Sequence, residues 1–201
     1  MITRRSALSG LMALPLVPSV FGERLIPWET RLIVAARSQI GITRSYDPAY
    51  VSLPYPNGDV PRDRGVCTDV VIRAYRDAFD FDLQAAVHGD MATAFSAYPK
   101  IWGLTRPDRN IGHRRVPNLE TYFRRHGTEH APPTSLADWQ AGDLYTMRLD
   151  GRLPHIGIVS DKVTPKGHRY VIHNIGAGTA EDDILGLFDD ERRFRFEPPR
   201  L

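Results

Sequence analysis

Residues 142–174 contain the pattern that most constrains the fold. Three short runs rich in apolar residues follow one another here, at 144–149, 155–161 and 168–173. Turn residues separate them, with Asp150 and Gly151 after the first run and Pro165 and Gly167 before the third. Runs of this length between turn residues are typical of consecutive antiparallel strands. The segment therefore predicts a small antiparallel sheet.

The second and third of these runs predict a hairpin that brings two histidines together. If the hairpin is centred near Thr164, His155 lies directly opposite His173. The separation of the two residues is even, so both side chains take the same face of the sheet. Two histidines on a solvated edge are the alternative that this pattern leaves open.

The only cysteine of the chain, Cys67, stands where a helical pattern begins. The turn residues Pro61, Asp63 and Gly65 come shortly before it. After it, apolar residues recur with the spacing of one helix face. They are Val70, Val71, Ala74, Tyr75, Ala78 and Phe79. Cys67 is therefore predicted in the first turn of a helix that packs on the core.

The first turn of a helix suits a cysteine nucleophile. Its unpaired N–H groups and the helix dipole favour an anion. We expect these groups to lower the pKa of Cys67 from about 8.5, and to donate hydrogen bonds to an oxyanion. A buried and inert thiol is the alternative.

The beginning of the sequence predicts export. Arg4 and Arg5 precede an apolar, uncharged run at 7–20 that is too short to span a bilayer. The letters TRRSAL resemble a twin-arginine signal, and we expect residues 1–22 to be removed near Gly22. An uncleaved anchor is the alternative. We therefore expect a periplasmic or otherwise exported protein with no stable membrane insertion after cleavage.

The remaining residues, 23–201, are enough for one domain with a core. The chain has 26 basic and 24 acidic residues, and removal of Arg4 and Arg5 leaves 24 of each. A mature domain near neutrality gives no reason to expect general nucleic-acid binding. One cysteine cannot form an internal disulfide, so outside the cytoplasm it is either buried or kept for its chemistry. The sequence does not indicate an oligomeric state.

These motifs together resemble the NlpC-type branch of the papain-like cysteine peptidases. A cysteine that opens a helix is followed by GDL, HIGIV and VIHN, in the order that this branch has them. The resemblance covers residues 29–175 and implies an α+β fold, with helices packed on an antiparallel sheet. DRGVCTDVVIRAYR, HRRVPNL and HIGIVSD are more closely similar to a family of exported bacterial proteins of unknown function within this superfamily.

The resemblance also implies an activity and the residues that carry it. Cys67 would be the nucleophile, His155 the general base and His173 the residue that orients the base. Asn174 is an alternative third residue. The implied enzyme is a hydrolase that cleaves amide or peptide bonds through an acyl-enzyme, without a metal or cofactor. Together with export, it implies peptidoglycan stem peptides or cross-links as the substrate.

The sequence departs from the branch in two places. Val66, Thr68 and Asp69 replace the usual Asp, Ser and Gly around the nucleophile, so substrate specificity is not expected to carry over. A helical region is inserted at about 81–141, where Asp90 is expected to cap one helix and Asn118 another that ends at Gly127. The candidates for substrate contact are Thr68, Asp69, His88, Asp90, His113, Arg114 and Arg115. Structural hydrogen bonding is the alternative for each of them.

The end of the chain predicts two further elements. The acidic tail predicts a short helix, followed by a strand near Phe194 and Phe196.

A catalytically silent cell-wall-binding module, with Cys67 inert, is one alternative function. A zinc amidase is another, although the H-E-x-x-H pattern is absent. The ligands of such an amidase would come from His88, Asp90, His113, His155 and His173.

Overall fold

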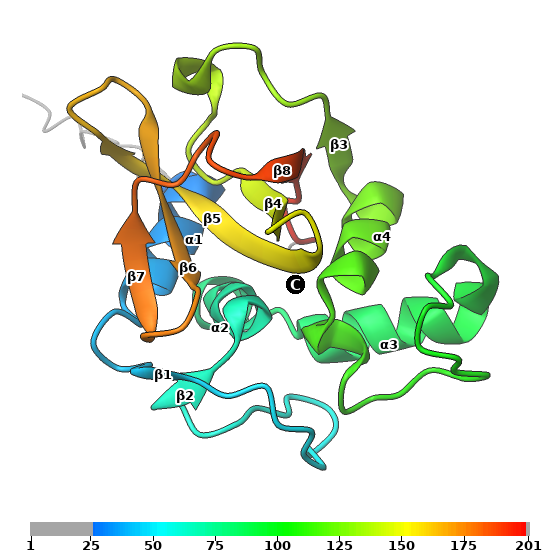
Figure 1. Ribbon diagram of the computed structural model, residues 1–201. Coiled ribbons are helices and arrows are strands. Elements are labelled where there is room, and N and C mark those ends of the chain that lie inside the picture. The colour runs from blue at the N-terminus through cyan, green and yellow to red at the C-terminus, as the bar shows by residue number, and fades with distance from the viewer. Residues whose placement is uncertain (1–25, 200–201) are drawn as a thin grey trace, which may run out of the picture.

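The computed structural model describes residues 26–199, which form an α+β structure (Figure 1). The predicted export signal, at 1–22, lies outside these residues. Within 26–199 no helix combines the length and the apolar character needed to cross a bilayer.

Helices and strands alternate in blocks along the described chain. The α-helices in residues 26–199 are α1 (Trp28–Arg37), α2 (Cys67–Phe79), α3 (Leu83–Ala94) and α4 (Val116–His126), and three short 3-10 turns are η1 (Phe95–Ala97), η2 (Gly112–Arg114) and η3 (Leu136–Asp138). The strands are β1 (Ser45–Tyr46), β2 (Arg64–Gly65), β3 (Thr128–His130), β4 (Leu144–Leu149), β5 (Leu153–Val163), β6 (Arg169–Asn174), β7 (Thr179–Asp182) and β8 (Asp189–Arg195).

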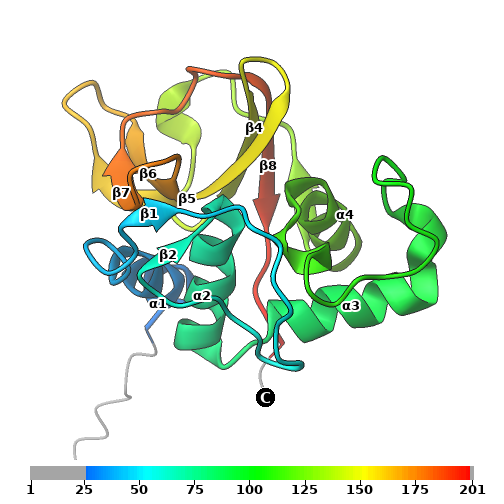
Figure 2. The ribbon, with the colours of Figure 1, turned by 60° about the horizontal axis from the view of Figure 1, so that its bottom comes forward.

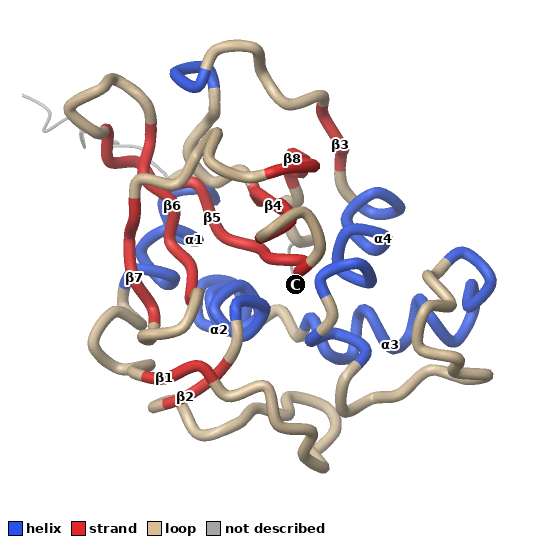
Figure 3. Tube along the Cα trace, viewed as in Figure 1, coloured by secondary structure: helices blue, strands red, loops and turns tan. Residues whose placement is uncertain are grey.

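The helices cover the sheet in two groups. Helices α1 and α2 lie side by side below β5 and β6, whereas α3 and α4 lie on the flank away from β7 (Figures 1 and 2). Strands β1 and β2 form a small parallel pair of their own next to the start of α2. Long irregular segments join β1 to β2 and η1 to η2 (Figure 3).

Helix α2 begins at Cys67, as the sequence predicts. The apolar stripe of this helix forms the centre of the core, since Val70, Val71, Ala74 and Tyr75 are completely buried. Full burial of one aliphatic or aromatic side chain contributes about 1.5–3 kcal/mol to stability, so the stripe holds the start of α2 firmly against the sheet.

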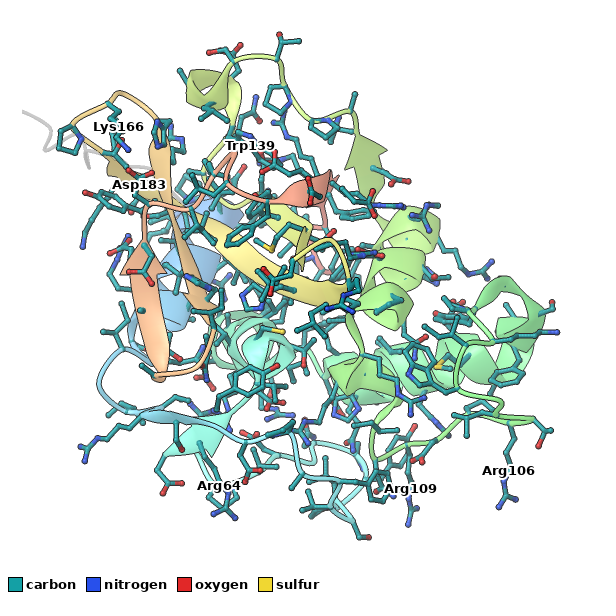
Figure 4. The ribbon with its side chains drawn as sticks, in the orientation of Figure 1. Arg64, Arg106, Arg109, Trp139, Lys166 and Asp183 are labelled. Atoms are coloured by element: carbon teal, nitrogen blue, oxygen red, sulfur yellow. The ribbon has the colours of Figure 1, made fainter. Side chains whose placement is uncertain are left out.

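The large sheet is antiparallel and has the strand order β3-β8-β4-β5-β6-β7. The three predicted strands are its centre, and the run at 144–149 coincides with β4. Neighbouring residues Ile158 and Val159 belong to separate clusters of buried side chains, because successive strand residues point to opposite faces. Trp139, labelled in Figure 4, lies in the second cluster.

The register of the β5–β6 hairpin differs from the predicted one by two residues. Ile158 pairs with Ile172 and Val159 with Val171, and the register shifts between Val159 and Val163. His155 is therefore a diagonal neighbour of His173 and does not lie directly opposite it. A shift of two preserves which side chains share a face, so the two histidines still meet.

The region at 81–141 contains α3, α4 and the three 3-10 turns, joined by irregular segments and β3. Two of its predicted caps are wrong. Asp82 caps α3 by accepting the N–H of Gln84 at 2.9 Å, and Asp90 lies inside that helix. Helix α4 starts after Arg115, so Asn118 lies in its first turn. Both predicted caps failed because each helix begins earlier than its apolar pattern indicates. The end of α4 at Gly127 is as predicted.

The predicted acidic helix near the end of the chain is wrong. Residues 179–182 form β7 and residues 189–195 form β8, which pair with β6 and β4. The local sequence is rich in residues that favour helices, but the free edges of β6 and β4 supply strand partners. Tertiary pairing here outweighs local propensity.

Candidate active site

Asp69 fixes the first turn of α2 and with it Cys67. Its carboxylate accepts the N–H of Val66 at 2.7 Å. The guanidinium of Arg114 donates two further hydrogen bonds to it, both of 2.9 Å, in a buried ion pair. The hydroxyl of Thr68 donates to the carbonyl oxygen of Arg114 at 3.2 Å. Thr68 and Asp69 thus connect the cysteine turn to η2, and their polar groups face the protein interior.

The thiol of Cys67 is almost completely buried, with 3% of the residue exposed. Burial raises its pKa to about 11. The N–H groups of Ile156 and Thr68 and the hydroxyl of Tyr46 oppose this by hydrogen bonding to the sulfur, and the charge of Asp69 adds to it. The expectation that the helix start lowers the pKa of this thiol is therefore wrong, because desolvation outweighs the local N–H groups.

Tyr46 and Ile156 place the sulfur between two elements. Tyr46 belongs to β1, and the same contact with the thiol helps raise the pKa of its phenol above the usual value. Ile156 directly follows His155 on β5, so a hydrogen bond from its N–H brings the sulfur against the backbone next to the candidate base. The sulfur therefore lies where the start of α2 meets the His155 end of β5.

His155, His173 and Asp182 form a chain of hydrogen bonds across β5, β6 and β7. The Nε2 atom of His155 lies 3.0 Å from Nδ1 of His173, and the two rings are perpendicular. The Nε2 atom of His173 lies 3.2 Å from Oδ2 of Asp182. Both histidines are buried, whereas half of the Asp182 side chain is exposed. The chain therefore runs from solvent into the protein and ends at His155.

The carboxylate of Asp182 sets the tautomers of both rings. A carboxylate only accepts hydrogen bonds, so Nε2 of His173 must carry its proton. In the neutral ring, Nδ1 of His173 then accepts from Nε2–H of His155. The remaining nitrogen of His155, Nδ1, is left with a lone pair. His155 is thus prepared to accept a proton at the one ring nitrogen that His173 does not use.

Both rings are neutral in the resting protein. Burial, reinforced by the charge of His173, lowers the pKa of His155 to about 3. Burial also lowers the pKa of His173, and the charge of Asp182 and its hydrogen bond partly oppose this. Together with the raised pKa of Cys67, these shifts give a neutral thiol and a neutral imidazole at pH 7.

Gly157 makes room for the diagonal pairing of the two histidines. A Cβ atom at this position would lie 2.5 Å from Cγ1 of Val171 and 3.1 Å from Cβ of His173. Real Cβ atoms do not approach other atoms so closely, so the strands would have to move apart. The glycine of the HIGIV motif therefore allows β6 to lie close enough for His173 to reach His155.

Asn174 has other partners. Its side-chain amide donates to the carbonyl oxygens of Ser45 and Gly65, at 3.3 and 3.1 Å. Its oxygen accepts the N–H of Gly176 at 3.1 Å. Asn174 thus ties the β1–β2 pair to the end of β6, and His173 is the residue that contacts His155.

Cys67 lines a pocket of about 210 Å³ that the residues around α2, η2 and α4 enclose. The aromatic rings of Tyr46 and Trp102 and the side chains of Arg114 and Arg115 also line it. The other lining residues are valines, prolines and one isoleucine. The pocket is smaller than the usual range of about 300–1,000 Å³ for drug-sized ligands, so it suits one group of a larger substrate.

Three of the candidates for substrate contact lie away from this pocket. His88 packs edge-on against Tyr55, with ring centroids 5.2 Å apart. Asp90 accepts from Arg125 at 2.8 Å, in an ion pair that joins α3 to α4. His113 is buried, and burial together with the charge of its neighbour lowers its pKa to about 4. Of the seven candidates, Arg114 and Arg115 are the two that line the pocket.

The suggested zinc ligands are dispersed in the structure. His88 and Asp90 lie on α3 and His113 in η2, whereas His155 and His173 pair with each other on the sheet. Among residues 26–199, no group of three or more His, Cys, Asp or Glu side chains is arranged to hold a metal ion.

Sequence reasoning missed three residues of this site, namely Tyr46, Trp102 and Asp182. Asp182 could have been found from the glycine-rich turn at 176–178, because such a turn after a strand indicates a hairpin. In that hairpin His173 pairs with Ala180, so Asp182 is a diagonal neighbour on the same face. Tyr46 and Trp102 lie near irregular segments, and no local pattern indicates where they fold.

Comparison with known proteins identifies relatives of the chain. The chain is 57% identical over 158 residues to a protein of Escherichia coli strain K12 that is described as uncharacterized protein YijF. The match spans 78% of this chain and 77% of the relative. Residues 33–196 match the family model described as a domain of unknown function, DUF1287. This range includes Cys67, His155, His173 and Asp182, and the chain belongs to the DUF1287 family.

Proposed function

We propose that the chain is a cysteine-dependent amide or peptide hydrolase of the papain-like, NlpC type that acts on peptidoglycan. The observation that carries this proposal is the hydrogen-bonded chain from Asp182 through His173 to His155. His155 directly precedes Ile156, whose backbone N–H hydrogen bonds to the thiol of Cys67. Such a chain prepares a base for a nucleophile. A helix that begins at the cysteine and packs on an antiparallel sheet also supports the papain-like arrangement.

In the first half of the reaction, Cys67 attacks the carbonyl carbon of the scissile amide. The S–H proton moves to Nδ1 of His155 as the S–C bond forms, so the thiol ionises only during the attack. This order agrees with a thiol pKa of about 11 and an imidazole pKa of about 3 in the resting protein. The C–N bond then breaks, and the proton on Nδ1 moves to the leaving amine.

In the second half, water hydrolyses the thioester. His155 takes a proton from the water as it attacks, the C–S bond breaks, and the proton returns to the sulfur. The N–H groups of Thr68 and Ile156 and the hydroxyl of Tyr46 already hydrogen bond to the sulfur. Donors in this position favour the negative charge that develops on the sulfur and on the carbonyl oxygen.

The choice of peptidoglycan rests on the expected export and on the resemblance to the NlpC branch. An exported bacterial hydrolase of amide bonds meets the peptides of the cell wall first. The cleaved bond would be a stem-peptide or cross-link amide.

A catalytically silent cell-wall-binding module is the second candidate. The raised pKa of Cys67 favours it, because a neutral buried thiol is a poor nucleophile. In that case the pocket would bind a cell-wall peptide and the histidine chain would only be structural.

Digestion of purified peptidoglycan, followed by mass analysis of the fragments, separates these possibilities. We expect the wild-type protein to release new amine and carboxyl ends, and Cys67→Ser to release none. Activity should survive a chelator and be lost on alkylation of the thiol. Binding to peptidoglycan without any cleavage would favour the silent module. Loss of activity to a chelator with recovery on addition of zinc would favour a zinc amidase.

A further inference from the structure

Two adjacent arginines line the pocket, and their surroundings differ. Arg114 is buried and makes a two-point ion pair with Asp69, so its charge is neutralised inside the protein. Arg115 lies with its guanidinium carbon 4.1 Å from the centre of the Trp102 ring. Stacking on an aromatic face fixes the plane of a guanidinium and leaves its N–H groups free to donate.

The guanidinium of Arg115 is not satisfied by the protein. Its Nη1 atom is buried and has no hydrogen-bond partner among residues 26–199. Burial lowers the pKa of Arg115, and the charge of Asp108 only partly opposes this. Asp108 itself is occupied by the Tyr50 hydroxyl at 3.0 Å and by the N–H of Asn110 at 2.8 Å. A buried donor without a partner is unfavourable, and more so when it is charged. The charge of Arg115 is thus available for a ligand.

The rest of the pocket lining favours an anion with an apolar surround. No acidic side chain of the described residues lines the pocket, and most of its lining is aliphatic, prolyl or aromatic. Hydrogen bonds between arginine and a carboxylate are strengthened in such poorly hydrated surroundings. Its volume of about 210 Å³ admits one carboxylate-bearing group beside Cys67.

We infer that Arg115, held by Trp102, binds a carboxylate of the substrate in the same pocket as the nucleophile Cys67. The preferred substrates are therefore acidic peptides whose carboxylate lies close to the scissile amide. The preference for acidic substrates rests on the proposed hydrolase function. Binding of a carboxylate to the pocket can be measured without turnover.

Binding to the inactive Cys67→Ala protein tests the site. Two pairs of peptides place a carboxylate in different positions, each against its neutral amide: N-acetyl-alanyl-alanine and its C-terminal amide, and N-acetyl-alanyl-glutamate amide and the matching glutamine amide. We expect calorimetry to show that the acid of at least one pair binds about tenfold or more tightly than its amide. The pair that discriminates tells whether a terminal or a side-chain carboxylate is bound.

Matched substitutions then assign the preference to Arg115. Arg115→Gln in the Cys67→Ala background should remove the preference, and Arg115→Lys should retain part of it, because the charge remains but the planar fork is lost. Arg106→Gln is the control, since Arg106 is exposed, lies in the segment between η1 and η2 that also holds Trp102, and points away from the body of the protein (Figure 4). Unchanged melting temperatures ensure that each variant is folded.

Three outcomes would overturn the inference. They are equal binding of acid and amide in both pairs, binding of neither member, and a preference that survives Arg115→Gln. The proposed hydrolase function fails separately. If the Cys67→Ala protein prefers acids through Arg115 but the wild-type protein cleaves no peptide or peptidoglycan, the carboxylate site stands and the hydrolase does not. If the wild-type protein cleaves acid and amide equally in both pairs, the hydrolase stands and the carboxylate site does not.

Discussion

The two sides of the Cys67 thiol differ in how their polar groups are satisfied. On the sheet side, the rings of His155 and His173 are 3.0 Å apart between Nε2 and Nδ1, and Nε2 of His173 lies 3.2 Å from the carboxylate of Asp182. On the α4 side, the Nη1 atom of Arg115 is buried with no hydrogen-bond partner among the described residues. The histidines and Asp182 hold their geometry through hydrogen bonds to one another and need no ligand. The guanidinium of Arg115, in contrast, leaves a donor for a ligand to bind.

Under the proposed hydrolase function, this difference separates the residues of the reaction from those that recognise the substrate. The sheet side fixes one tautomer of His155 through bonds internal to the protein, so it should serve any substrate that reaches the thiol. The α4 side offers a charge and an aromatic ring, so it should decide which substrates are held there. Variants on the sheet side are therefore expected to lower kcat, and those on the α4 side to change discrimination between substrates.

Removal of the base should have the largest effect. We expect His155→Ala to lower kcat by about 10²- to 10⁴-fold, because His155 is the base that we propose for the proton of Cys67. The measurement is release of new amine ends from peptidoglycan under saturating substrate. A His155→Ala protein with more than a tenth of wild-type turnover would mean that the thiol does not depend on this ring.

The resting state of the thiol gives the next largest effect. Burial raises the pKa of Cys67 to about 11, so its thiolate fraction at pH 7 is roughly three hundredfold below that of a free cysteine of pKa about 8.5. Iodoacetamide should therefore react with the folded protein more slowly than with the protein in denaturant, by roughly the same factor. The rate should rise continuously as the pH approaches about 11.

The single cysteine makes this measurement specific, because all label incorporated reports on Cys67. A rate that is already high below neutral pH, and that His155→Ala abolishes, would contradict the neutral pair. It would show instead an ion pair between thiolate and imidazolium in the resting protein.

Asp182 should have an intermediate effect on turnover. Asp182→Asn keeps the shape of the side chain but lets its amide donate to Nε2 of His173, which favours the wrong tautomer of both rings. We expect kcat to fall about tenfold, less than for His155→Ala, because 49% of the Asp182 side chain is exposed and water replaces part of the interaction. His173→Gln should behave similarly, and Asp182→Glu should recover part of the activity.

Unchanged KM is the accompanying readout for Asp182→Asn, since the carboxylate lies two strands away from β5 and the pocket lining does not include it. A rise in KM at constant kcat would place Asp182 in substrate binding and not in the orientation of the histidines.

The sequence predicts the sheet side of the site better than the α4 side, for a physical reason. Cys67, His155 and His173 lie on a helix and two strands whose positions follow from the periodicity of the sequence. Because side chains on a strand alternate with a period of two, a register error of two residues leaves both histidines on the same face. The apolar stripe of α2 predicts where this helix starts, and the first four residues of the stripe are completely buried in the structure.

What the sequence does not show depends on contacts between distant segments. Asp182 lies in a segment whose composition favours a helix, and pairing with β6 makes it a strand. The pKa of Cys67 was misjudged because a helix start is visible in sequence, whereas the depth of burial that opposes it is not. Trp102 meets Arg115 through an irregular segment, for which no periodicity exists.

The smallest effect on turnover is expected in the helical arm formed by α3 and the C-terminal end of α4, which lies outside the pocket lining. Asp90 accepts hydrogen bonds from Tyr98 at 2.6 Å and from Arg125 at 2.8 Å, and these hold its pKa well below the usual range. A carboxyl whose pKa is lowered on folding stabilises the protein above its unfolded pKa of about 3.9 and loses that contribution as the pH falls.

Asp90→Asn should therefore lower the melting temperature at pH 7 and make it less dependent on pH below about 4, while turnover stays within twofold of wild type. The reason is that this carboxylate joins α3 to α4 and the pocket lining does not include it. His88→Ala is the companion variant, since His88 packs against Tyr55 and also lies outside the pocket lining. A large loss of turnover in either variant at unchanged stability would mean that the arm contacts the substrate. Substrate recognition would then extend beyond the pocket around Cys67.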